Sequence, residues 1–508
     1  MLRAQFARNK LTRDAYSLYP ERTGMRICDT IIRSANVLDG SRGASEPLDV
    51  AILGDRICEI GRALQVDALK SIDAEGLALA PGFIDVHTHD DTSVIRTPQM
   101  LPKLSQGVTT VIAGNCGISA APVHLHGDPP DPMNLLGGSE AFCYPTFAEY
   151  VEAVRRARPA VNVCALVGHT SLRSNHMDRL DRSATAVEIE LMVAQLREAL
   201  DGGALGLSSG LAYLSAYAAS TEEVLALARP LAATGAVYTT HMRSEADAIL
   251  EAMDEAFEIG RLSRVPTIIS HLKCAGIDNW GRSSEILRAL DAARALQPVA
   301  CDCYPYAAGS STLDLRQVDE RVTVTITWSS PHPEIAGRSL EQIAKDWTLT
   351  QLEAARLLLP AGAIYHSISE DDMRRILGHP ATMIGSDGLP NDPRPHPRLW
   401  GTFPRVLGRY CRELKLFSLP EAIYKMTGMP AQRFGLARRG QIREGYHADL
   451  VLFDPETIED AATFSDPTLP AIGIEGVWVN GVLSYTCQGS TEQRNGRFLP
   501  RSRTAWIE

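Results

Sequence analysis

The sequence predicts an α/β fold: a (β/α)8 TIM-like barrel with a small β domain formed from both terminal segments and an insertion after strand seven. Three observations favour this fold. Eight short β-branched runs alternate with amphipathic stretches, β-rich segments stand at both ends, and one connection is far longer than the others. The expected parts are an N-terminal extension (1–25), the first part of the small β domain (26–80), the barrel (81–435), and the second part of the small domain with a C-terminal tail (436–508).

The composition and charge of the chain argue against nucleic-acid and membrane partners. The chain has 508 residues and a formal net charge of −11, which argues against nucleic-acid partners because these require clustered Lys and Arg. No window approaches 18 uninterrupted apolar residues, and the first 25 residues lack the apolar core of a signal peptide, so no membrane partner is expected. The ten cysteines are scattered without a C-x-x-C pair, which favours a reducing, cytoplasmic compartment.

Both ends of the chain are predicted to be rich in short β-strands. Short strands separated by Gly, Asp and Ser are expected between residues 27 and 80, and similar runs occur near the C-terminus in GYHADLVLFDP and EGVWVNGVLSYT. Neither region shows much helical periodicity. We therefore expect the two segments to pair into one small sheet.

The middle of the chain contains the pattern of repeated βα units. Amphipathic stretches at 187–200, 221–234 and 284–296 predict helices, and Thr221 followed by acidic residues is a good helix start. The eight predicted strands cover residues 82–89, 108–116, 161–169, 203–210, 236–242, 266–272, 299–304 and 381–387.

The connection between the seventh and eighth strands, residues 305–380, is too long for an ordinary βα connection. It contains the polar and aromatic run TVTITWSSPHPE and two expected helices, LEQIAKDW and LEAARLLL. Insertions at strand ends of such barrels commonly shape the substrate pocket, so we expect this segment to do so.

Six competent metal ligands stand at the carboxyl ends of the predicted strands, where catalytic groups of such barrels belong. Residues two positions apart on a strand face the same side about 6–7 Å apart, so a strand at 82–89 would present two imidazoles together. One metal could be held by this pair and a thiolate, and a second by the thiolate and two further imidazoles. The six residues are His87, His89, Cys116, His241, His271 and Asp387.

Each of these residues has a simpler interpretation when taken alone. A single strand His is usually a core or surface residue, and a buried Cys is usually a small hydrophobe. Four of the 13 histidines, however, fall within the last few residues of predicted barrel strands, and an Asp joins them in the same register. The combination favours a metal site.

Several separate runs resemble the amidohydrolase superfamily and, within it, the D-aminoacylase family of N-acyl-D-amino-acid deacylases. The similarity covers nearly the whole chain from about residue 27, and its motifs occur in the family's order. They are APGFIDVHTHDD, NCG, HMRSE, SHLK, YPY, GSDG and GYHADLVLFD.

The resemblance implies a metal-dependent barrel in which Cys116 replaces the carboxylated Lys that bridges metals in related enzymes. No Lys lies on the second to fourth predicted strands, so the carbamate-containing branch fits poorly. By the same resemblance Cys116, His241 and His271 would hold a tight Zn²⁺, and His87 and His89 a weaker second ion. Asp387 matches the family's catalytic base, which would take a proton from water and return it to the leaving amine.

The resemblance also implies contacts to a substrate carboxylate. Arg398 is similar to the family's carboxylate-binding Arg, whose guanidinium pairs bidentately with a carboxylate. The other substrate contacts it implies are Lys273, Tyr213, Tyr304 and Ser310, with Ser311 as the alternative to Ser310.

Residues 206–210 match the G-x-S-x-G nucleophile elbow of serine hydrolases. Such an elbow turns directly into a helix, whereas here LAYLSAYAAS intervenes before the helix expected at residue 221. Cys301 and Cys303 share one face of a predicted strand, and strand cysteines of this kind usually pack. Neither motif is expected to carry chemistry.

The expected function is zinc-dependent hydrolysis of N-acyl-D-amino acids to a carboxylate and a D-amino acid, with a small N-acylated amino acid as the partner molecule. The D preference comes from the resemblance alone. Two alternatives remain: an amidohydrolase acting on a cyclic or carboxylate-bearing amide, similar to hydantoinases and dihydroorotases, or a non-catalytic scaffold of the same fold.

Overall fold

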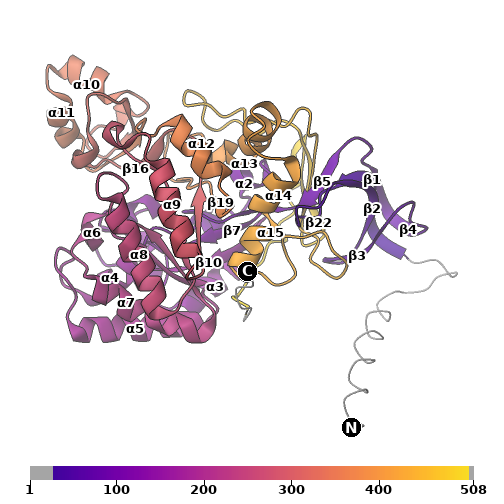
Figure 1. Cartoon of the computed structure of the whole chain (residues 1–508), viewed down its shortest axis with the longest axis horizontal. Coiled ribbons are helices and arrows are strands. Elements are labelled where there is room, and N and C mark those ends of the chain that lie inside the picture. The colour runs from indigo at the N-terminus through magenta and orange to yellow at the C-terminus, as the bar shows by residue number, and fades with distance from the viewer. Residues whose placement is uncertain (1–26, 503–508) are drawn as a thin grey trace, which may run out of the picture.

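A barrel of eight parallel strands forms the centre of the protein in a computed structural model that describes residues 27–502 (Figure 1). The extension expected over residues 1–25 lies outside the described residues. Each strand coincides with one of the apolar runs, because a parallel barrel strand is covered on both faces. The strands are β6 (Phe83–Asp85), β7 (Val108–Ala113), β10 (Asn162–Ala165) continued by β11 (Val167–Gly168), β12 (Gly206–Gly210), β13 (Val237–His241), β14 (Thr267–Ile269), β15 (Val299–Cys303) and β19 (Thr382–Ile384).

The barrel closes between its first and last strands. β6, β7 and β10 pair in parallel, as do β11, β12, β13, β14, β15 and β19, and Leu166 alone separates β10 from β11. On the other side, Thr88 forms a parallel bridge with Gly388, and the Asp387 amide N donates to the His87 carbonyl O at 2.8 Å. The predicted α/β barrel class is confirmed.

The strands are shorter at the mouth of the barrel than the sequence predicts. The sixth strand, expected over residues 266–272, ends at Ile269. His271 has a φ of 35°, in the left-handed region that a strand cannot accommodate. The polar ends of the strands predicted at 82–89, 108–116, 266–272 and 381–387 are therefore loops that follow the strands.

Helices cover the outside of the barrel, and the three helices expected from periodicity are present as α5 (Ala186–Asp201), α7 (Thr221–Ala228) and α9 (Ser283–Arg294). The helix α7 begins at Thr221, but Ser220 caps it, because the Ser220 hydroxyl accepts a hydrogen bond from the Glu223 amide N. Among residues 27–502, no helix is both long enough and apolar enough to cross a membrane. Other outer helices are α3 (Phe147–Ala157), α8 (Ile249–Ser263), α12 (Glu370–Gly378) and α14 (Leu419–Met426).

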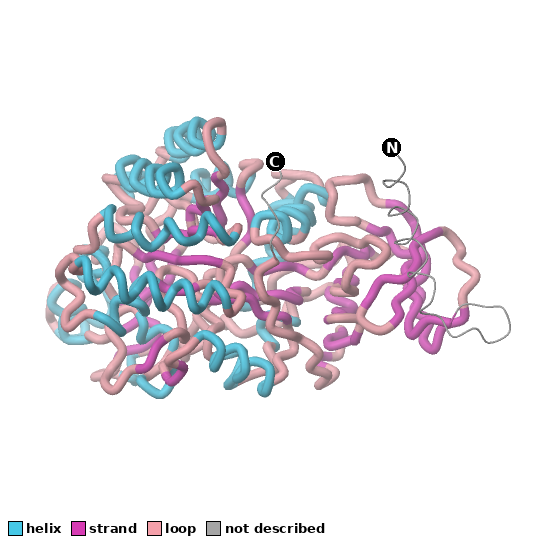
Figure 2. Tube along the Cα trace, turned by 90° about the horizontal axis from the view of Figure 1, so that it is seen from below, coloured by secondary structure: helices cyan, strands magenta, loops and turns pink. Residues whose placement is uncertain are grey.

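One sheet combines strands from both ends of the described chain, visible in Figure 1 as indigo and yellow strands beside the barrel. The strands from the two ends of the chain meet where β5 (Ala78–Pro81) pairs antiparallel with β20 (Leu450–Phe453). Figure 2 shows the sheet region as magenta tube at the opposite end from the barrel helices. Its remaining strands are β1 (Ile27–Val37), β2 (Glu46–Leu53), β3 (Arg56–Gly61), β4 (Asp67–Asp73), β21 (Ile474–Val479), β22 (Val482–Thr486) and β23 (Gly489–Ser490).

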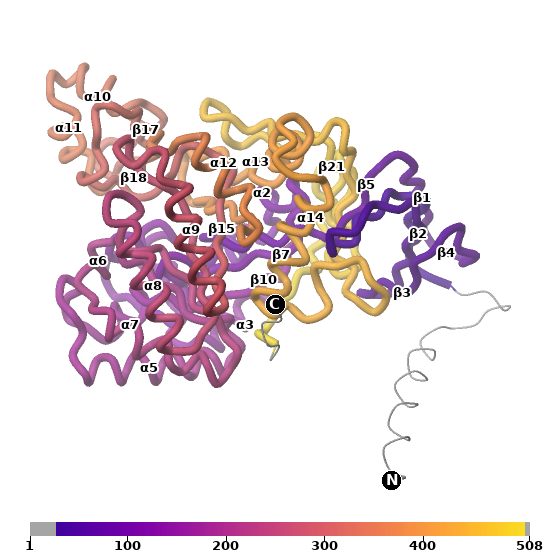
Figure 3. The backbone as a smooth tube through the Cα atoms, viewed as in Figure 1, coloured from indigo at the N-terminus to yellow at the C-terminus, as the bar shows by residue number. Residues whose placement is uncertain are grey.

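The long connection after β15 forms its own small layer. β16 (Gly309–Thr312) and β17 (Val324–Ser329) flank β18 (Ala361–Tyr365) in an antiparallel sheet. The two expected helices are present as α10 (Leu340–Trp347) and α11 (Gln351–Leu358), and they share a separate apolar core with this sheet. Figure 3 shows α10, α11, β17 and β18 together at one corner of the molecule.

Candidate metal centre and substrate cavity

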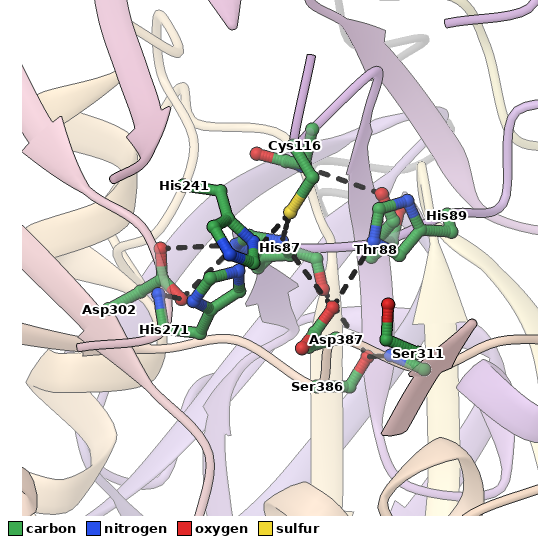
Figure 4. Close-up of polar contacts among 12 residues, drawn as sticks. His87, Thr88, His89, Cys116, His241, His271, Asp302, Ser311, Ser386 and Asp387 are labelled. Carbon is green, nitrogen blue, oxygen red and sulfur yellow. Dashed lines mark hydrogen bonds and ion pairs between the residues drawn. The ribbon is translucent and has the colours of Figure 1, made fainter. Parts of the chain in front are cut away.

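The six predicted ligand residues converge at the carboxyl ends of the barrel strands (Figure 4). They are far apart in the sequence, but the parallel barrel brings the ends of its strands to one mouth. The donor atoms of His87, Cys116, His271 and Asp387 all lie within 4.8 Å of one another. His241 is the last residue of β13, and its ring centroid lies 4.5 Å from that of His271.

The pair His87 and His89 reaches this cluster by a different geometry from the predicted one. β6 ends at Asp85, so both histidines belong to the segment that follows the strand. The prediction that they lie on one face of a strand was therefore wrong. Their ring centroids are nevertheless 5.7 Å apart. The His89 side chain contacts Asp387, with Nε2 lying 3.2 Å from Asp387 Oδ1.

The Cys116 thiol lies between two imidazoles. Its Sγ is 3.1 Å from His87 Nε2 and 3.2 Å from His271 Nε2, and all three residues are buried. Burial raises the pKa of a thiol, but the charges of His87 and His271 outweigh burial and hold the pKa of Cys116 well below its ordinary value. The thiolate is the form of Cys that binds metal ions.

Two carboxylates that sequence reasoning missed hold these imidazoles in place. Asp302 Oδ2 lies 3.3 Å from His87 Nδ1, and Asp302 Oδ1 accepts a hydrogen bond from the His271 amide N at 2.9 Å. Glu245 Oε1 lies 2.9 Å from His271 Nδ1, and Glu245 Oε2 lies 3.5 Å from His241 Nε2. Carboxylates in this position fix the tautomer and orientation of a metal-binding imidazole.

A signal for both carboxylates was present in the sequence. Glu245 is the last residue of the HMRSE run, four residues after His241. Asp302 lies between Cys301 and Cys303 on β15, so on a strand it must face opposite to them, into the barrel. A single charged residue in an apolar barrel strand is the signal that could have identified it.

Asp387 is held between the imidazoles and a guanidinium. Its Oδ2 lies 2.9 Å from Arg398 Nη1, and its Oδ1 lies 3.5 Å from His87 Nε2. Burial raises the pKa of Asp387, but the charges of Arg398 and His87 hold it well below the ordinary carboxyl value. The residue therefore faces the cluster as a carboxylate.

A buried lysine behind the site supports the loop that carries Asp387. Lys103 Nζ lies 2.8 Å from Asp85 Oδ2 and 2.9 Å from Ser386 Oγ. Asp85 Oδ1 accepts a hydrogen bond from the Ser386 amide N at 2.8 Å. This buried network joins the first barrel strand to the residue that precedes Asp387.

The predicted substrate residues line a cavity of about 680 Å³ that opens from the cluster. Arg398 begins the helix α13 (Arg398–Arg405), is completely buried, and donates from Nη2 to the Ser310 carbonyl O at 2.9 Å. Its guanidinium lies 4.6 Å from the centroid of the Tyr304 ring. The predicted residues in the cavity wall are Tyr213, Lys273, Tyr304, Ser310, Ser311 and Arg398.

Buried polar atoms without a protein partner gather at this place. Within the described part of the chain, Arg398 Nε, Tyr304 Oη and Ser310 Oγ have no hydrogen-bond partner. Unsatisfied buried polar atoms are costly and uncommon in folded proteins. Their arrangement around one wall of the cavity is suited to a ligand that supplies acceptor oxygens.

The serine motif at residues 206–210 has a structural role. These residues form β12, and Ser208 Oγ accepts a hydrogen bond from the Gly117 amide N at 3.1 Å. A Cβ atom at Gly210 would lie 2.1 Å from the Cys116 carbonyl O, so the glycine permits close contact between β12 and the loop that carries Cys116. The expectation that this motif is not a nucleophile agrees with its place in a strand.

Comparison with known proteins identifies the family. A sequence model described as the Amidohydrolase family matches residues 70–485. The chain belongs to this amidohydrolase family. The recognition made from the sequence motifs is therefore confirmed.

Three amidohydrolase relatives are similar to the chain over nearly its whole length. D-aminoacylase of Alcaligenes xylosoxydans xylosoxydans is 48% identical over 474 residues, covering 93% of this chain and 98% of that protein. N-acyl-D-aspartate deacylase of the same organism is 46% identical over 482 residues, covering 94% and 97%. The crystal structure of N-acyl-D-glutamate deacylase from Bordetella bronchiseptica, complexed with zinc and a phosphonate inhibitor that mimics the tetrahedral intermediate, matches with a TM-score of 0.90 and 43% identity over 94% of this chain and 100% of that chain.

Proposed function

We propose that this amidohydrolase hydrolyses the amide bond of N-acyl-D-amino acids with the aid of zinc, releasing a carboxylate and a D-amino acid. One observation supports the proposal above all: four imidazoles, the Cys116 thiol and the Asp387 carboxylate meet at the barrel mouth, beside the buried Arg398. The relatives that act on N-acyl-D-amino acids support the substrate class and its D configuration.

The donor set fits zinc. Thiolate and imidazole are the ligands that Zn²⁺ prefers, and two buried imidazole nitrogens of the cluster, His89 Nδ1 and His241 Nδ1, have no hydrogen-bond partner among residues 27–502. We assign Cys116, His241 and His271 to a tight site. A second, weaker site is assigned to His87 and His89, and Asp387 is assigned to the metal centre as the carboxylate that faces the substrate.

Zinc, when bound, supplies a water of lowered pKa and a positive charge that polarises the amide carbonyl. Asp387 accepts the proton of the attacking water and delivers it to the leaving nitrogen, acting first as base and then as acid. Arg398 orients the substrate by pairing with its α-carboxylate, and Tyr304 and Ser310 donate to the same group. Lys273 and Tyr213 complete the substrate contacts.

We also propose that the enzyme works in the cytoplasm on a small N-acylated amino acid. All ten cysteines are free thiols, which fits a reducing compartment.

Substrate tests and metal content distinguish the proposed function from the two alternatives, a cyclic-amide amidohydrolase and a non-catalytic scaffold. Hydrolysis of hydantoins or dihydropyrimidines would favour a cyclic-amide amidohydrolase, and a protein without metal or turnover would be a scaffold.

The decisive experiment assays N-acetyl-D- and N-acetyl-L-amino acids alongside zinc stoichiometry. We expect turnover of D substrates with zinc bound and little turnover of L substrates. Asp387→Asn should retain most of the zinc while kcat falls by about 100- to 10,000-fold, because the proton acceptor is lost. Near-normal kcat in this variant would remove Asp387 from the mechanism, and hydrolysis of cyclic amides alone would overturn the proposed substrate class.

A further inference from the structure

Arg398, the residue assigned to the substrate carboxylate, is fixed both at its guanidinium and at its backbone. Its Nη1 lies 2.9 Å from Asp387 Oδ2, and its Nη2 donates to the Ser310 carbonyl O at 2.9 Å. At the backbone, the Arg398 amide N donates to His396 Nδ1 at 2.9 Å. His396 therefore fixes the point at which this side chain leaves the backbone.

The His396 imidazole supplies an acceptor that the start of α13 requires. The first amide groups of a helix have no partner within the helix, and Pro397, the residue before α13, offers no side-chain acceptor. Residues such as Ser, Asp or Asn usually accept from these amides. Here an imidazole does so, and Pro395 and Pro397 on either side of it restrict the backbone of the segment.

Aromatic side chains hold this imidazole in its orientation. His396 is completely buried, and its ring lies edge-to-face with the rings of Tyr306 and Phe464, at a centroid distance of 5.0 Å in both cases. Tyr306 follows β15, and Phe464 belongs to the segment between β20 and β21. Three segments that are distant in the sequence thus meet around one ring.

The imidazole must be neutral to accept this hydrogen bond, because both nitrogens of a protonated imidazole are donors. Burial and the positive charge of Arg398 hold the pKa of His396 well below its ordinary value, and they outweigh the opposite effect of Asp387. With its one proton on Nε2, the ring keeps the lone pair of Nδ1 for the Arg398 amide. The surroundings of His396 therefore maintain the form that the contact requires.

We propose that His396 is a positioning residue, which holds the first residue of α13 so that the Arg398 guanidinium faces the substrate cavity. His396 is not among the described residues that line the cavity, so it acts through Arg398 and not on the substrate. The inference rests on the proposed deacylase function and adds a residue to it.

Three substitutions separate the acceptor from the rest of the ring. His396→Leu removes the acceptor, and His396→Gln moves an amide oxygen one bond farther from the backbone, so both should raise KM for an N-acetyl-D-amino acid by about 10-fold with a smaller change in kcat. His396→Asn places an oxygen at the position of Nδ1 and should keep KM within about 2-fold of wild type. An Asn variant as impaired as the Leu variant, or a Leu variant with wild-type KM, overturns the inference.

A double-mutant cycle tests whether His396 acts through Arg398. His396→Leu should raise KM much less in an Arg398→Ala background than in the wild type, because the side chain that it positions is already gone. An N-acetyl-D-amino-acid amide, which lacks the α-carboxylate, should also respond little to His396→Leu. Additive effects in the cycle, or an equal rise in KM for the amide, would show a general structural role and contradict the inference.

The matched control is His169→Leu. His169 is also a completely buried imidazole, its Nε2 lies 2.9 Å from Glu223 Oε1, and it does not line the cavity. Its loss should lower the stability of the protein without changing KM. An equal rise in KM in the two Leu variants overturns the inference but leaves the deacylase function intact, whereas a wild-type protein that hydrolyses no N-acyl-D-amino acid overturns the proposed function itself.

Discussion

Three residues of the candidate metal centre have backbone conformations that residues other than glycine rarely adopt. Cys116, His271 and Asp387 have φ values of 54°, 35° and 51°. Such conformations cost about 1–3 kcal/mol each and persist where the surrounding structure fixes them. Here each one follows a barrel strand and turns a side chain toward the same point. The strain therefore belongs to the preorganisation of the site.

Arg398→Lys tests the carboxylate contact. A lysine keeps the positive charge but loses the planar fork that pairs bidentately with a carboxylate, so KM should rise by about 10- to 100-fold with a smaller change in kcat. Steady-state kinetics on an N-acyl-D-amino acid measure the effect. A matched N-acyl-D-amino-acid amide, which lacks the carboxylate, should respond much less. A KM that stays the same would mean that the substrate carboxylate binds elsewhere.

Glu245→Gln tests the support of the imidazoles. Glu245 contacts His271 and His241, so its loss should lower zinc affinity by about 10- to 100-fold. Competition with a chelator measures the affinity. Glu255→Gln is the control, because Glu255 pairs with Arg243 away from the cavity and should leave zinc affinity unchanged. Equal affinities for wild type and Glu245→Gln would show that the carboxylate does not act on the metal site.

At the scale of elements, a buried charge cluster joins two outer helices to each other. Glu223, on α7, lies 2.9 Å from His169 Nε2 and pairs with Arg173, and both partners belong to α4 (His169–His176). Glu223 Oε2 also accepts a hydrogen bond from the Ala184 amide N at 2.9 Å. Burial raises the pKa of Glu223, but hydrogen bonding to His169 and nearby positive charges lower it to about 2.

This cluster predicts a pH dependence of stability. A carboxyl group whose pKa is lower in the folded state stabilises the fold above its unfolded pKa, so this contribution should be lost as pH falls from about 5 to about 2. Glu223→Gln should lower the free energy of unfolding by about 3 kcal/mol at pH 7, because Arg173 is left buried without its partner. Denaturant unfolding at several pH values should show the difference shrinking as pH falls.

The control for Glu223 is Glu188→Gln. Glu188 also pairs with an arginine, Arg182, but that pair lies near the surface, where ion pairs contribute little. We expect a much smaller change in the free energy of unfolding for this variant. A gap between wild type and Glu223→Gln that stays constant from pH 7 to pH 3 would contradict the assignment of the lowered pKa.

The sequence was informative about elements where local patterns determine them. The run 187–200 predicted α5 because its apolar residues recur at helical spacing, and the apolar runs located every barrel strand. The strand ends were not predictable, because the turn after β14 depends on tertiary contacts that fix His271 in a left-handed conformation. The three-stranded sheet of the insertion was also missed, since β18 pairs with partners distant in sequence and has no alternating pattern.

The side chains of the candidate site also differ in whether local sequence or tertiary contacts identify them. Ligand residues could be chosen because they stand at the ends of apolar runs, as His241 does at the end of β13. Asp302 and Glu245 were missed because their importance comes from which imidazole they touch, and contacts of this kind depend on the packing of separate strands.

At the scale of the whole molecule, the sheet and the barrel share one apolar core. Val451 and Val477 of the sheet belong to the same buried cluster as Phe83 and Val108 of the barrel. The contact is close, since a Cβ atom at Gly107 would lie 2.7 Å from Val451 Cγ2. Strands from both ends of the described chain therefore cover one side of the barrel and complete its core.

A shared core predicts that sheet and barrel unfold together. Val451→Ala removes two buried methyl groups far from the metal centre and should lower the free energy of unfolding by ~2 kcal/mol. Activity reports the barrel mouth, and the fluorescence of Trp478, a buried residue of the sheet, reports the sheet once the other five tryptophans are replaced by phenylalanine. In that background, Val451→Ala should shift both transitions to lower denaturant concentration by the same amount. If the Trp478 transition moved while the activity transition stayed in place, the sheet would be an independent folding unit, and the continuous core would not couple it to the barrel.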